Sequence, residues 1–248
     1  MKIVAIIQAR MGSTRLPGKV MKEVCGKPLL EYLIERVRKS KLIHEIVIAT
    51  SIKTTEQPII DLCNRLNVNY FRGSEEDVLS RYYEAAHYYK ADLVIRLTAD
   101  NPLIDPHIID KIISFFLSDP TKYDYVSNTL DRTYPRGLDT EVFSMKALEQ
   151  AYHQADQPAY REHVTPYIYL HPEKFQLGNV TNDTNYSSIR LTVDTEEDFS
   201  LIKKIIETFH HQKMECFHLE DIIHLLQQHP DWITENRHIQ QKLIEDNQ

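Results

Sequence analysis

The chain opens with an apolar run followed at once by a cationic loop, and this segment constrains the fold more than any other. Residues 3–7, Ile-Val-Ala-Ile-Ile, predict a buried strand. The loop occupies residues 9–19, and apolar residues at helical spacing follow over 29–37. A strand, a glycine-containing loop and a helix form the layout of a phosphate-binding site in an open α/β sheet.

Three cations lie within the eleven residues of this loop and have few acidic neighbours. Gly12 and Gly18 allow backbone N–H groups to approach an anion closely. The loop therefore predicts a site for a nucleoside triphosphate, and the alternative is a basic surface turn that caps a helix. The predicted nucleotide contacts of the loop are Ala9, Arg10, Gly12, Ser13, Arg15 and Lys19.

Two familiar glycine motifs are excluded. A P-loop reads G-x-x-x-x-G-K-[ST], but here five residues separate Gly12 from Gly18. Val20 follows Lys19, so no hydroxyl is available there for magnesium. The dinucleotide fingerprint G-x-G-x-x-G is also absent from the sequence.

Strand and helix signals alternate regularly through the first half of the chain, which predicts a mostly parallel sheet with helices on both faces. Further strands are expected over residues 45–50, 68–71 and 93–97, and helices over 59–66, 77–89 and 106–117. Residues 120–188 lack this regularity, a strand is expected over 188–193, and a helix follows through Phe209. We therefore expect a single domain over 1–248, with a core of 1–118 and 188–210, an α+β insertion at 119–187, and a peripheral helical segment at 211–248.

Composition restricts the possible partners. The net charge of −7 argues against a general nucleic-acid binder, because such proteins carry a basic footprint. No apolar run approaches the length needed to span a bilayer, and the N-terminus does not resemble a signal peptide, so a cytoplasmic protein without a membrane partner is expected. Cys25, Cys63 and Cys216 are widely spaced without CxxC, so reduced thiols are expected and neither a disulfide framework nor a zinc site is indicated.

Two aspartates come directly after predicted strands. Asp100 follows the strand at 93–97, and Asp194 follows the strand at 188–193. Ligands of open α/β sheets bind beyond the carboxyl ends of strands, and magnesium prefers carboxylate oxygens. Asp100 is therefore either a metal ligand or the cap of the next turn. Asp198, three residues after Thr195, is either a ligand or part of a helix capping arrangement.

Residues 9–19 resemble the signature loop of the sugar-acid cytidylyltransferases, which make CMP-activated 3-deoxy-octulosonate and sialic acids. The segment Val193-Asp-Thr-x-x-Asp198 resembles the end of the core of that superfamily, and the branch named for spore coat polysaccharide biosynthesis (SpsF-type) is the most similar. The resemblance implies a Rossmann-like nucleotide-diphospho-sugar transferase fold and Mg²⁺ bound by Asp100 and Asp194. It also implies catalytic roles for Arg10, Arg15, Lys19 and Asp100.

The same resemblance extends to the substrates. The segment 72–81 is similar to stretches that lie along the nucleoside, so Gly73, Ser74 and Arg81 are expected to contact base or ribose. The segments 134–141 and 161–165 resemble the SpsF-type branch, and arginine's forked donor suits a carboxylate. The candidate acceptor-binding residues are Arg136, Asp139, Glu141, Arg161 and His163, and His163 is also a candidate general base.

The sequence therefore predicts transfer of CMP from CTP to a sugar acid of the 2-keto-3-deoxy type, with release of pyrophosphate, in a homodimer by analogy with the family. Two alternatives are a glycosyltransferase that uses a nucleotide-sugar and a non-catalytic nucleotide-binding protein of polysaccharide assembly. Glycosyltransferases of related architecture use a D-x-D motif, but the first position here is Thr98. This departure favours nucleotidyl transfer.

Overall fold

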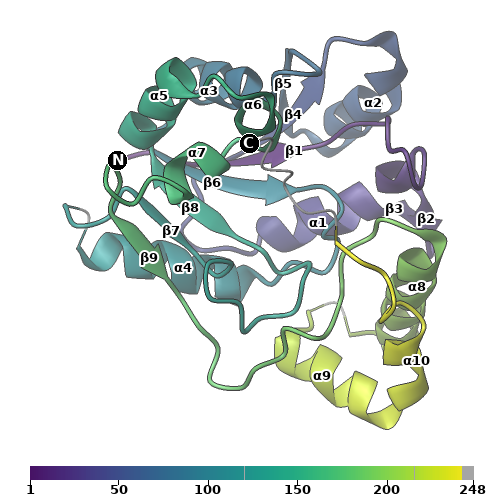
Figure 1. The fold of residues 1–248 in the computed structure, drawn as a ribbon. Coiled ribbons are helices and arrows are strands. Elements are labelled where there is room, and N and C mark those ends of the chain that lie inside the picture. Colours follow the sequence, from purple (N-terminus) through teal and green to yellow (C-terminus); the bar gives the residue numbers. More distant parts are fainter. Residues whose placement is uncertain (120, 215, 242–248) are drawn as a thin grey trace.

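A seven-stranded sheet forms the centre of the protein in the computed structural model, which describes residues 1–119, 121–214 and 216–241. The strand order is β5-β4-β1-β6-β8-β7-β9 (Figure 1). Its first four members are parallel: β1 (Ile3–Gln8), β4 (Glu45–Ser51), β5 (Asn69–Gly73) and β6 (Leu93–Thr98). This confirms the mostly parallel sheet expected from the alternating sequence pattern.

Helices cover both faces of this sheet (Figure 1). One apolar core holds residues of α1 (Leu29–Val37), α2 (Gln57–Leu66) and α4 (Pro106–Ser118). The other core holds residues of α3 (Val78–Tyr88) and α5 (Met145–Gln154). Successive residues of β1 alternate between the two cores, because side chains of a strand point to opposite faces. A strand buried on both faces explains why 3–7 are apolar throughout.

The described residues of the segment 119–187 form both strands and helices, as the predicted α+β insertion requires. It adds three strands to the same sheet, β7 (Tyr125–Ser127), β8 (Glu141–Ser144) and β9 (Leu177–Asn179), of which β8 pairs antiparallel with β6 and with β7. Two short helices, α6 (Pro158–His163) and α7 (Pro166–Tyr169), follow α5. Strands of three or four residues are too short to produce a readable alternation.

The prediction of a strand over 188–193 is wrong. These residues make no ladder and form only one isolated bridge, between Arg136 and Arg190. Their alternation reflects burial rather than sheet pairing, since Ile189, Leu191 and Val193 face the core. The segment is held by loops: Leu191 N–H donates to the Arg136 carbonyl at 2.7 Å and Val193 N–H to the Asp100 carbonyl at 2.8 Å.

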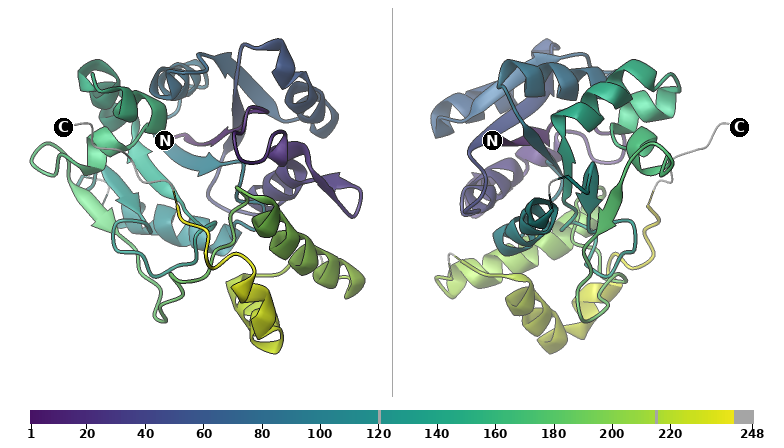
Figure 2. Two further views of the ribbon diagram at one scale, coloured as in Figure 1. Left: turned by 45° about the vertical axis from the view of Figure 1, so that its right-hand side comes forward. Right: turned by 90° about the vertical axis from the view of Figure 1, so that its left-hand side faces the viewer.

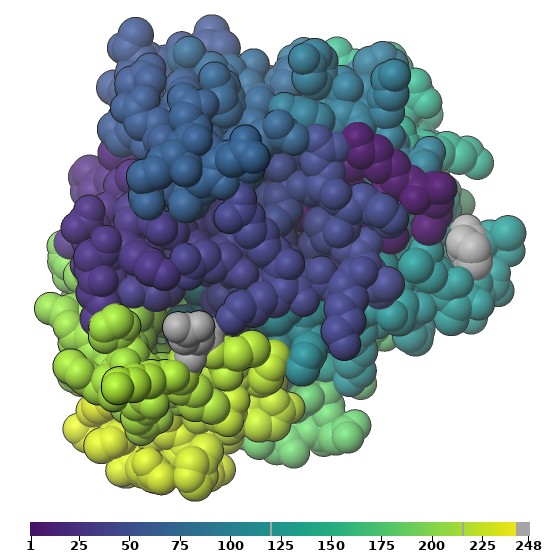
Figure 3. Space-filling view, turned by 180° about the vertical axis from the view of Figure 1, so that it is seen from behind, coloured from purple at the N-terminus to yellow at the C-terminus, as the bar shows by residue number. Residues whose placement is uncertain are grey.

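Three helices complete the chain, α8 (Glu196–His211), α9 (Leu219–Gln228) and α10 (Pro230–Thr234). They gather on one side of the sheet (Figure 2), and from behind the C-terminal residues adjoin the N-terminal third of the chain (Figure 3). The C-terminal segment expected over 211–248 contains helices α9 and α10, and Ile222, Leu226 and Asn236 within it are buried. Residues 215 and 242–248 of that predicted segment lie outside the described residues. Within the described part of the chain, no helix has the length and apolar content to cross a membrane.

Two 3-10 turns and one short hairpin complete the description of the fold. The loop 9–19 ends in a short 3-10 turn, Lys19–Met21, and a two-residue hairpin follows with strands β2 (Glu23–Val24) and β3 (Lys27–Pro28). A second 3-10 turn, Thr54–Glu56, precedes α2.

Candidate active site

Hydrogen bonds to Met11 hold the loop 9–19 in its conformation. Gly18 has φ of +68°, a left-handed conformation that glycine adopts without cost. Its N–H donates to the Met11 carbonyl at 2.9 Å, and Met11 N–H donates at 2.9 Å to the buried carboxylate of Glu56. The Gly18 N–H is therefore engaged within the loop rather than facing an anion, contrary to the expectation. Gly12 has ordinary room for a Cβ, 3.9 Å from Glu75 Oε1.

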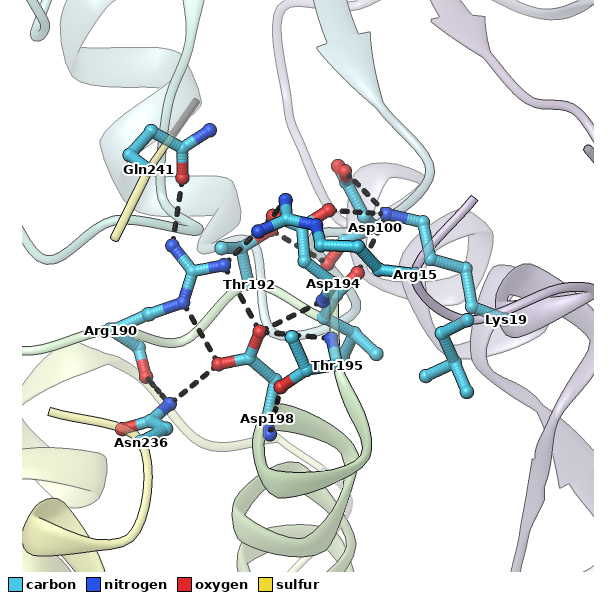
Figure 4. A network of polar contacts seen from close by, with 12 residues as sticks. Arg15, Lys19, Asp100, Arg190, Thr192, Asp194, Thr195, Asp198, Asn236 and Gln241 are labelled. Atoms are coloured by element: carbon cyan, nitrogen blue, oxygen red, sulfur yellow. Dashed lines mark hydrogen bonds and ion pairs between the residues drawn. The ribbon is translucent and has the colours of Figure 1, made fainter. Parts of the chain in front are cut away.

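Lys19 is the centre of the site (Figure 4). Its Nζ donates to Asp100 Oδ2 at 2.9 Å, to Asp194 Oδ1 at 2.8 Å and to the Val193 carbonyl at 2.7 Å. Arg15 adds an ion pair to Asp194 Oδ2 at 2.9 Å. The structure thus brings together the two predicted metal ligands and two of the three predicted loop cations. Thr98 Oγ1 donates to Asp100 Oδ1 at 2.5 Å and orients that carboxylate.

The pKa shifts reflect this mutual neutralisation. Burial alone would lower the pKa of Lys19, but the neighbouring Asp100 and Asp194 outweigh it and raise that pKa. Burial likewise opposes ionisation of Asp194, yet Lys19, Arg15 and Arg190 hold its pKa below the ordinary value. Lys19 and Asp194 are therefore both charged at neutral pH.

Arg190 is a member of the site that the sequence analysis missed. Its guanidinium is 5% exposed and bonds to Asp194 Oδ2 at 2.8 Å and to both Asp198 oxygens, at 2.8 and 3.0 Å. Asp198 also completes the capping box with Thr195, which confirms the capping alternative. Asn236 binds the Arg190 carbonyl, and Gln241 accepts from Arg190 Nη1 at 2.7 Å (Figure 4). An arginine within a predicted strand gave no signal, because its partners come from elsewhere in the chain.

The predicted nucleoside contacts lie on β5 and the start of α3. Arg81 is fully buried, and its Nη1 donates to the Ser74 carbonyl at 2.9 Å. Its Nε and Nη2 have no hydrogen-bond partner among the described residues. Burial and the nearby charge of Arg10 lower the pKa of Arg81. Gly73 packs against this side chain, since a Cβ there would lie 3.0 Å from Arg81 Cγ.

Arg10 faces a cleft with a volume of about 330 Å³. Arg10 makes no hydrogen bond or ion pair with any other residue that the structure describes. Arg161, from α6, also lines the cleft, with its guanidinium held by Asp77 Oδ2 at 2.5 Å and by the Tyr152 carbonyl at 2.7 Å. Asp77 is the N-cap of α3, accepting from Ser80 N–H. Arg161, predicted to bind the acceptor, therefore lies at the start of α3, near the residues predicted to contact the nucleoside.

His163 is held by a strained turn. The Thr165 N–H donates to the His163 carbonyl at 2.9 Å around Val164, whose φ is +74° and ψ is −60°. This is the γ-turn of positive φ, which is rare and costly for a β-branched residue. Burial, opposed by Glu162 and aided by Arg96 and Arg10, lowers the pKa of His163, so the imidazole is neutral at pH 7. Such strain concentrates at functional sites.

Glu141 is buried and fully engaged. It forms an ion pair with Arg96 and accepts hydrogen bonds from Tyr125 Oη at 2.6 Å and from Thr165 Oγ1 at 2.7 Å. This network ties β6, β7 and β8 to Thr165, the last residue of the γ-turn. The predicted acceptor-binding residue Glu141 thus supports the fold beside the site, which the sequence could not show because Arg96 and Tyr125 are distant in the chain.

The remaining acceptor candidates are Arg136, whose backbone forms a bridge with Arg190, and Asp139. Arg136 makes no side-chain hydrogen bond or ion pair within the described chain, and burial together with the charge of Arg132 lowers its pKa. Asp139 is occupied by Arg132, which binds both its oxygens, at 2.5 and 2.9 Å. Gly137 has φ of +100°, and a Cβ there would lie 2.4 Å from the backbone carbon of Leu191. Glycine is required because the two segments touch.

The comparisons agree with this geometry. A family model described as cytidylyltransferase matches residues 4–236. An uncharacterized protein of Methanocaldococcus jannaschii is 41% identical over 98% of this chain and 97% of its own length. The spore coat polysaccharide biosynthesis protein SpsF of Bacillus subtilis is 36% identical over 94% of this chain and 97% of its own. The 3-deoxy-manno-octulosonate cytidylyltransferase of Geobacter metallireducens is 34% identical over 48% of this chain and 46% of its own.

A solved cytidylyltransferase from Leptospira borgpetersenii is 35% identical and superposes with a TM-score of 0.91 over 97% of this chain and 100% of that structure. The fold and the converging loops thus define an α/β nucleotidyltransferase. The chain belongs to the cytidylyltransferase family, within the sugar-acid cytidylyltransferase superfamily, and uses CTP.

Proposed function

We propose that the protein transfers CMP from CTP to a sugar acid of the 2-keto-3-deoxy type, for synthesis of a cell-surface or spore coat polysaccharide. The observation that carries this proposal is the convergence of Asp100 and Asp194 on Lys19, beside Arg15. The names of the related SpsF protein and of the 3-deoxy-manno-octulosonate enzyme support the acid as substrate class. The acceptor hydroxyl forms a bond to the α-phosphorus, the bond to the bridging oxygen breaks, and pyrophosphate leaves.

The donor set of the site suits Mg²⁺. Asp100 and Asp194 offer hard carboxylate oxygens that already share one cation, the Lys19 ammonium. These two residues would hold the ion. When bound, Mg²⁺ would neutralise phosphate oxygens and lower the pKa of the attacking hydroxyl. With the ion on these carboxylates, Arg15 and Lys19 would neutralise the triphosphate together with Arg10.

The nucleoside is proposed to lie along Gly73, Ser74 and Arg81. The two unpartnered N–H groups of buried Arg81 require acceptors, since an unsatisfied buried donor is costly. Cytosine offers acceptors at its carbonyl oxygen and ring nitrogen. Ala9, Gly12 and Ser13 of the loop remain proposed contacts to the nucleotide.

The acceptor is proposed to lie in the segment 119–187. Arg136 is the strongest candidate for its carboxylate, because the guanidinium is partly buried, forked and unpaired within the described chain. Neutral His163 is the proposed recipient of the hydroxyl proton. Asp139, held by Arg132, is proposed to contact sugar hydroxyls. Glu141 and Arg161 act by positioning Thr165 and the start of α3.

Calorimetric titration with CTP, UTP, GTP, ATP and UDP-glucose, each with magnesium, tests the nucleotide. CTP should bind selectively, and the selectivity should be lost in Arg15→Ala; preferential binding of UDP-glucose would overturn the proposal. A pyrophosphate-release assay with 2-keto-3-deoxy acids and matched neutral sugars then tests the acceptor. Release with neutral sugars alone would overturn the substrate class while leaving CTP use intact.

The homodimer expected from the family is also part of this proposal. Large apolar side chains are exposed on the segment 119–187, Leu130 at 41% and Leu170 at 45%, and on α3, Tyr88 at 70%. Light scattering during size-exclusion chromatography should give twice the mass of the 29.1 kDa chain. A mass of one chain at all protein concentrations would contradict it.

A further inference from the structure

The Asp194 carboxylate binds three cations that differ in how firmly the protein holds them. Its Oδ1 accepts from Lys19 Nζ at 2.8 Å, and its Oδ2 binds Arg15 Nη2 at 2.9 Å and Arg190 Nη2 at 2.8 Å. The Arg15 side chain is 29% exposed and belongs to the loop 9–19, whereas the Arg190 side chain is 5% exposed. Arg15 can therefore turn toward a triphosphate, while Arg190 is enclosed by the protein.

A second aspartate fixes the guanidinium of Arg190. Its Nε donates to Asp198 Oδ1 at 2.8 Å and its Nη2 to Asp198 Oδ2 at 3.0 Å, which makes a bidentate pair. Asp198 is fully buried, and its Oδ2 also accepts the Asp194 N–H at 2.9 Å. The pair therefore holds Asp194 twice, by its side chain through Arg190 and by its backbone through Asp198 (Figure 4).

The contact with Asp198 also balances the charge of Arg190. An unpaired arginine beside two proposed metal ligands would repel a divalent ion. Asp198 carries the opposite charge in direct contact, so the pair adds little net charge to the site. Each of the three guanidinium nitrogens of Arg190 has an acceptor, so the buried group needs no further partner. Arg190 can thus orient Asp194 without weakening the attraction of the site for a cation.

Residues that follow α10 complete the support of this pair. Asn236 is buried, and its Nδ2 donates to the Arg190 carbonyl at 3.0 Å and to Asp198 Oδ1 at 2.9 Å. Gln241 Oε1 accepts from Arg190 Nη1 at 2.7 Å. The C-terminal stretch therefore contacts both the backbone and the side chain of Arg190.

We propose that Arg190 is a positioning residue that fixes Asp194 with Oδ1 as the oxygen available to the divalent ion. The C-terminal Asn236 and Gln241 hold Arg190 in this role. The inference rests on the proposed function, because it takes Asp100 and Asp194 as the ligands of the ion. Asp100 Oδ2 and Asp194 Oδ1 already share one ammonium group, so these two oxygens meet at one point. Partners that orient a metal-bound carboxylate commonly change metal affinity by about 10-fold to 100-fold.

Binding of Mn²⁺ to the full chain, with CTP and without an acceptor, tests the proposal. Mn²⁺ suits carboxylate ligands, and its binding to protein is measured by the enhanced relaxation of water protons. Arg190→Gln is combined with Asp198→Asn, so that no buried carboxylate loses its partner. This double variant should bind Mn²⁺ about 10-fold to 100-fold more weakly than the unmodified chain. Arg190→Lys should lose less, because it keeps a positive charge without the bidentate geometry.

A milder pair of variants tests the C-terminal contact. Gln241→Ala removes the acceptor of Arg190 Nη1 and should weaken Mn²⁺ binding in the same direction by a smaller factor. Gln240→Ala is the matched control, because Gln240 is also exposed and makes no side-chain hydrogen bond within the described chain. It should bind Mn²⁺ as the unmodified chain does. Equal affinities in these two variants would overturn the role given to Gln241.

The Mg²⁺ dependence of pyrophosphate release separates positioning from a purely structural role. In the double variant the half-saturating Mg²⁺ concentration should rise by the same factor as the Mn²⁺ dissociation constant, while kcat at saturating Mg²⁺ recovers most of its value. A lower melting temperature with unchanged Mn²⁺ affinity would overturn the proposal. Circular dichroism verifies folding, and Gln241→Ala against Gln240→Ala provides the test if the double variant does not fold. Absence of Mn²⁺ binding by the unmodified chain would instead overturn the metal site of the proposed function, and this inference with it.

Discussion

The proposed nucleotide side and the proposed acceptor side of the candidate site differ in how their positive charges are paired. On the nucleotide side Lys19 and Arg15 pair with aspartates at 2.8–2.9 Å. On the acceptor side Arg136 has no hydrogen-bond or ion-pair partner among the described residues, although burial lowers its pKa. A paired charge can be buried at small cost, whereas an unpaired one is stabilised only when an anion arrives. The charges of Lys19 and Arg15 are thus balanced before binding, whereas Arg136, like Arg10, depends on a ligand.

The largest expected effect is loss of catalysis on the nucleotide side. Asp100→Asn should lower turnover by about 10²-fold or more, because it removes one of two carboxylates proposed for the metal. The fold should persist, since the Asp100 carbonyl keeps its bond to Val193 N–H. Pyrophosphate release and thermal melting measure the two effects.

Asp110→Asn is the control for this change, because Asp110 is a partly exposed carboxylate of α4 that binds Ser40 and Lys41. It should retain turnover. Activity of Asp100→Asn within tenfold of the unmodified protein would contradict the metal assignment.

The next largest effect is expected at the contact between Gly137 and the backbone of Leu191. Gly137→Ala places a Cβ 2.4 Å from the Leu191 backbone at φ of +100°, so it should destabilise the protein by about 3 kcal/mol through overpacking and backbone strain. Gly26→Ala, with φ of +77° and nothing within 4 Å, should cost only about 1 kcal/mol. Urea unfolding measures both, and equal losses would show that the contact is unimportant.

Substitution of Arg136 tests the proposed acceptor side separately from the proposed nucleotide side. Arg136→Ala should lower kcat/KM for the acceptor by about 10-fold to 100-fold, which is the value of a charge-assisted hydrogen bond, while the affinity for CTP is unchanged. Arg136→Lys should restore part of the loss, because it keeps the charge without the fork. A parallel loss of CTP affinity would assign Arg136 to the nucleotide side instead.

His163 gives the smallest effect. Its folded-state pKa lies below 6.5, so the unfolded chain binds more protons, and stability should decline as the pH falls below 6.5 and level off once the folded form is protonated. His163→Gln should remove that part of the decline. Urea unfolding on either side of pH 6.5 measures it, and an unchanged pH dependence would show that His163 does not titrate as described.

The sequence predicts the nucleotide side better than the acceptor side for a physical reason. In the parallel half, local signals suffice: an apolar strand, then a loop or an aspartate at its carboxyl end, and Arg15, Lys19 and Asp100 do meet there. In the segment 119–187 the charges pair across long sequence separations, as Glu141 does with Arg96. No local pattern reveals such partners.

The partners of Arg190 could not be predicted from the sequence either. Alternating apolar residues around it predicted a strand, yet the segment is clamped between the loops at Asp100 and Arg136. Only the assembled chain shows that Arg190 links Asp194 to Asp198 and to the C-terminal residue Gln241.

The ion pairs of Figure 4 also bear on how the protein captures its substrate from solution. Three positive groups, Arg15, Lys19 and Arg190, face three negative ones, Asp100, Asp194 and Asp198, so their fields cancel at a distance. A polyanion approaching from beyond a Debye length meets little attraction from this cluster. Stopped-flow measurements should therefore show an association rate for CTP that changes little with ionic strength, as expected of an enzyme that recognises its nucleotide on contact and does not steer it by long-range attraction.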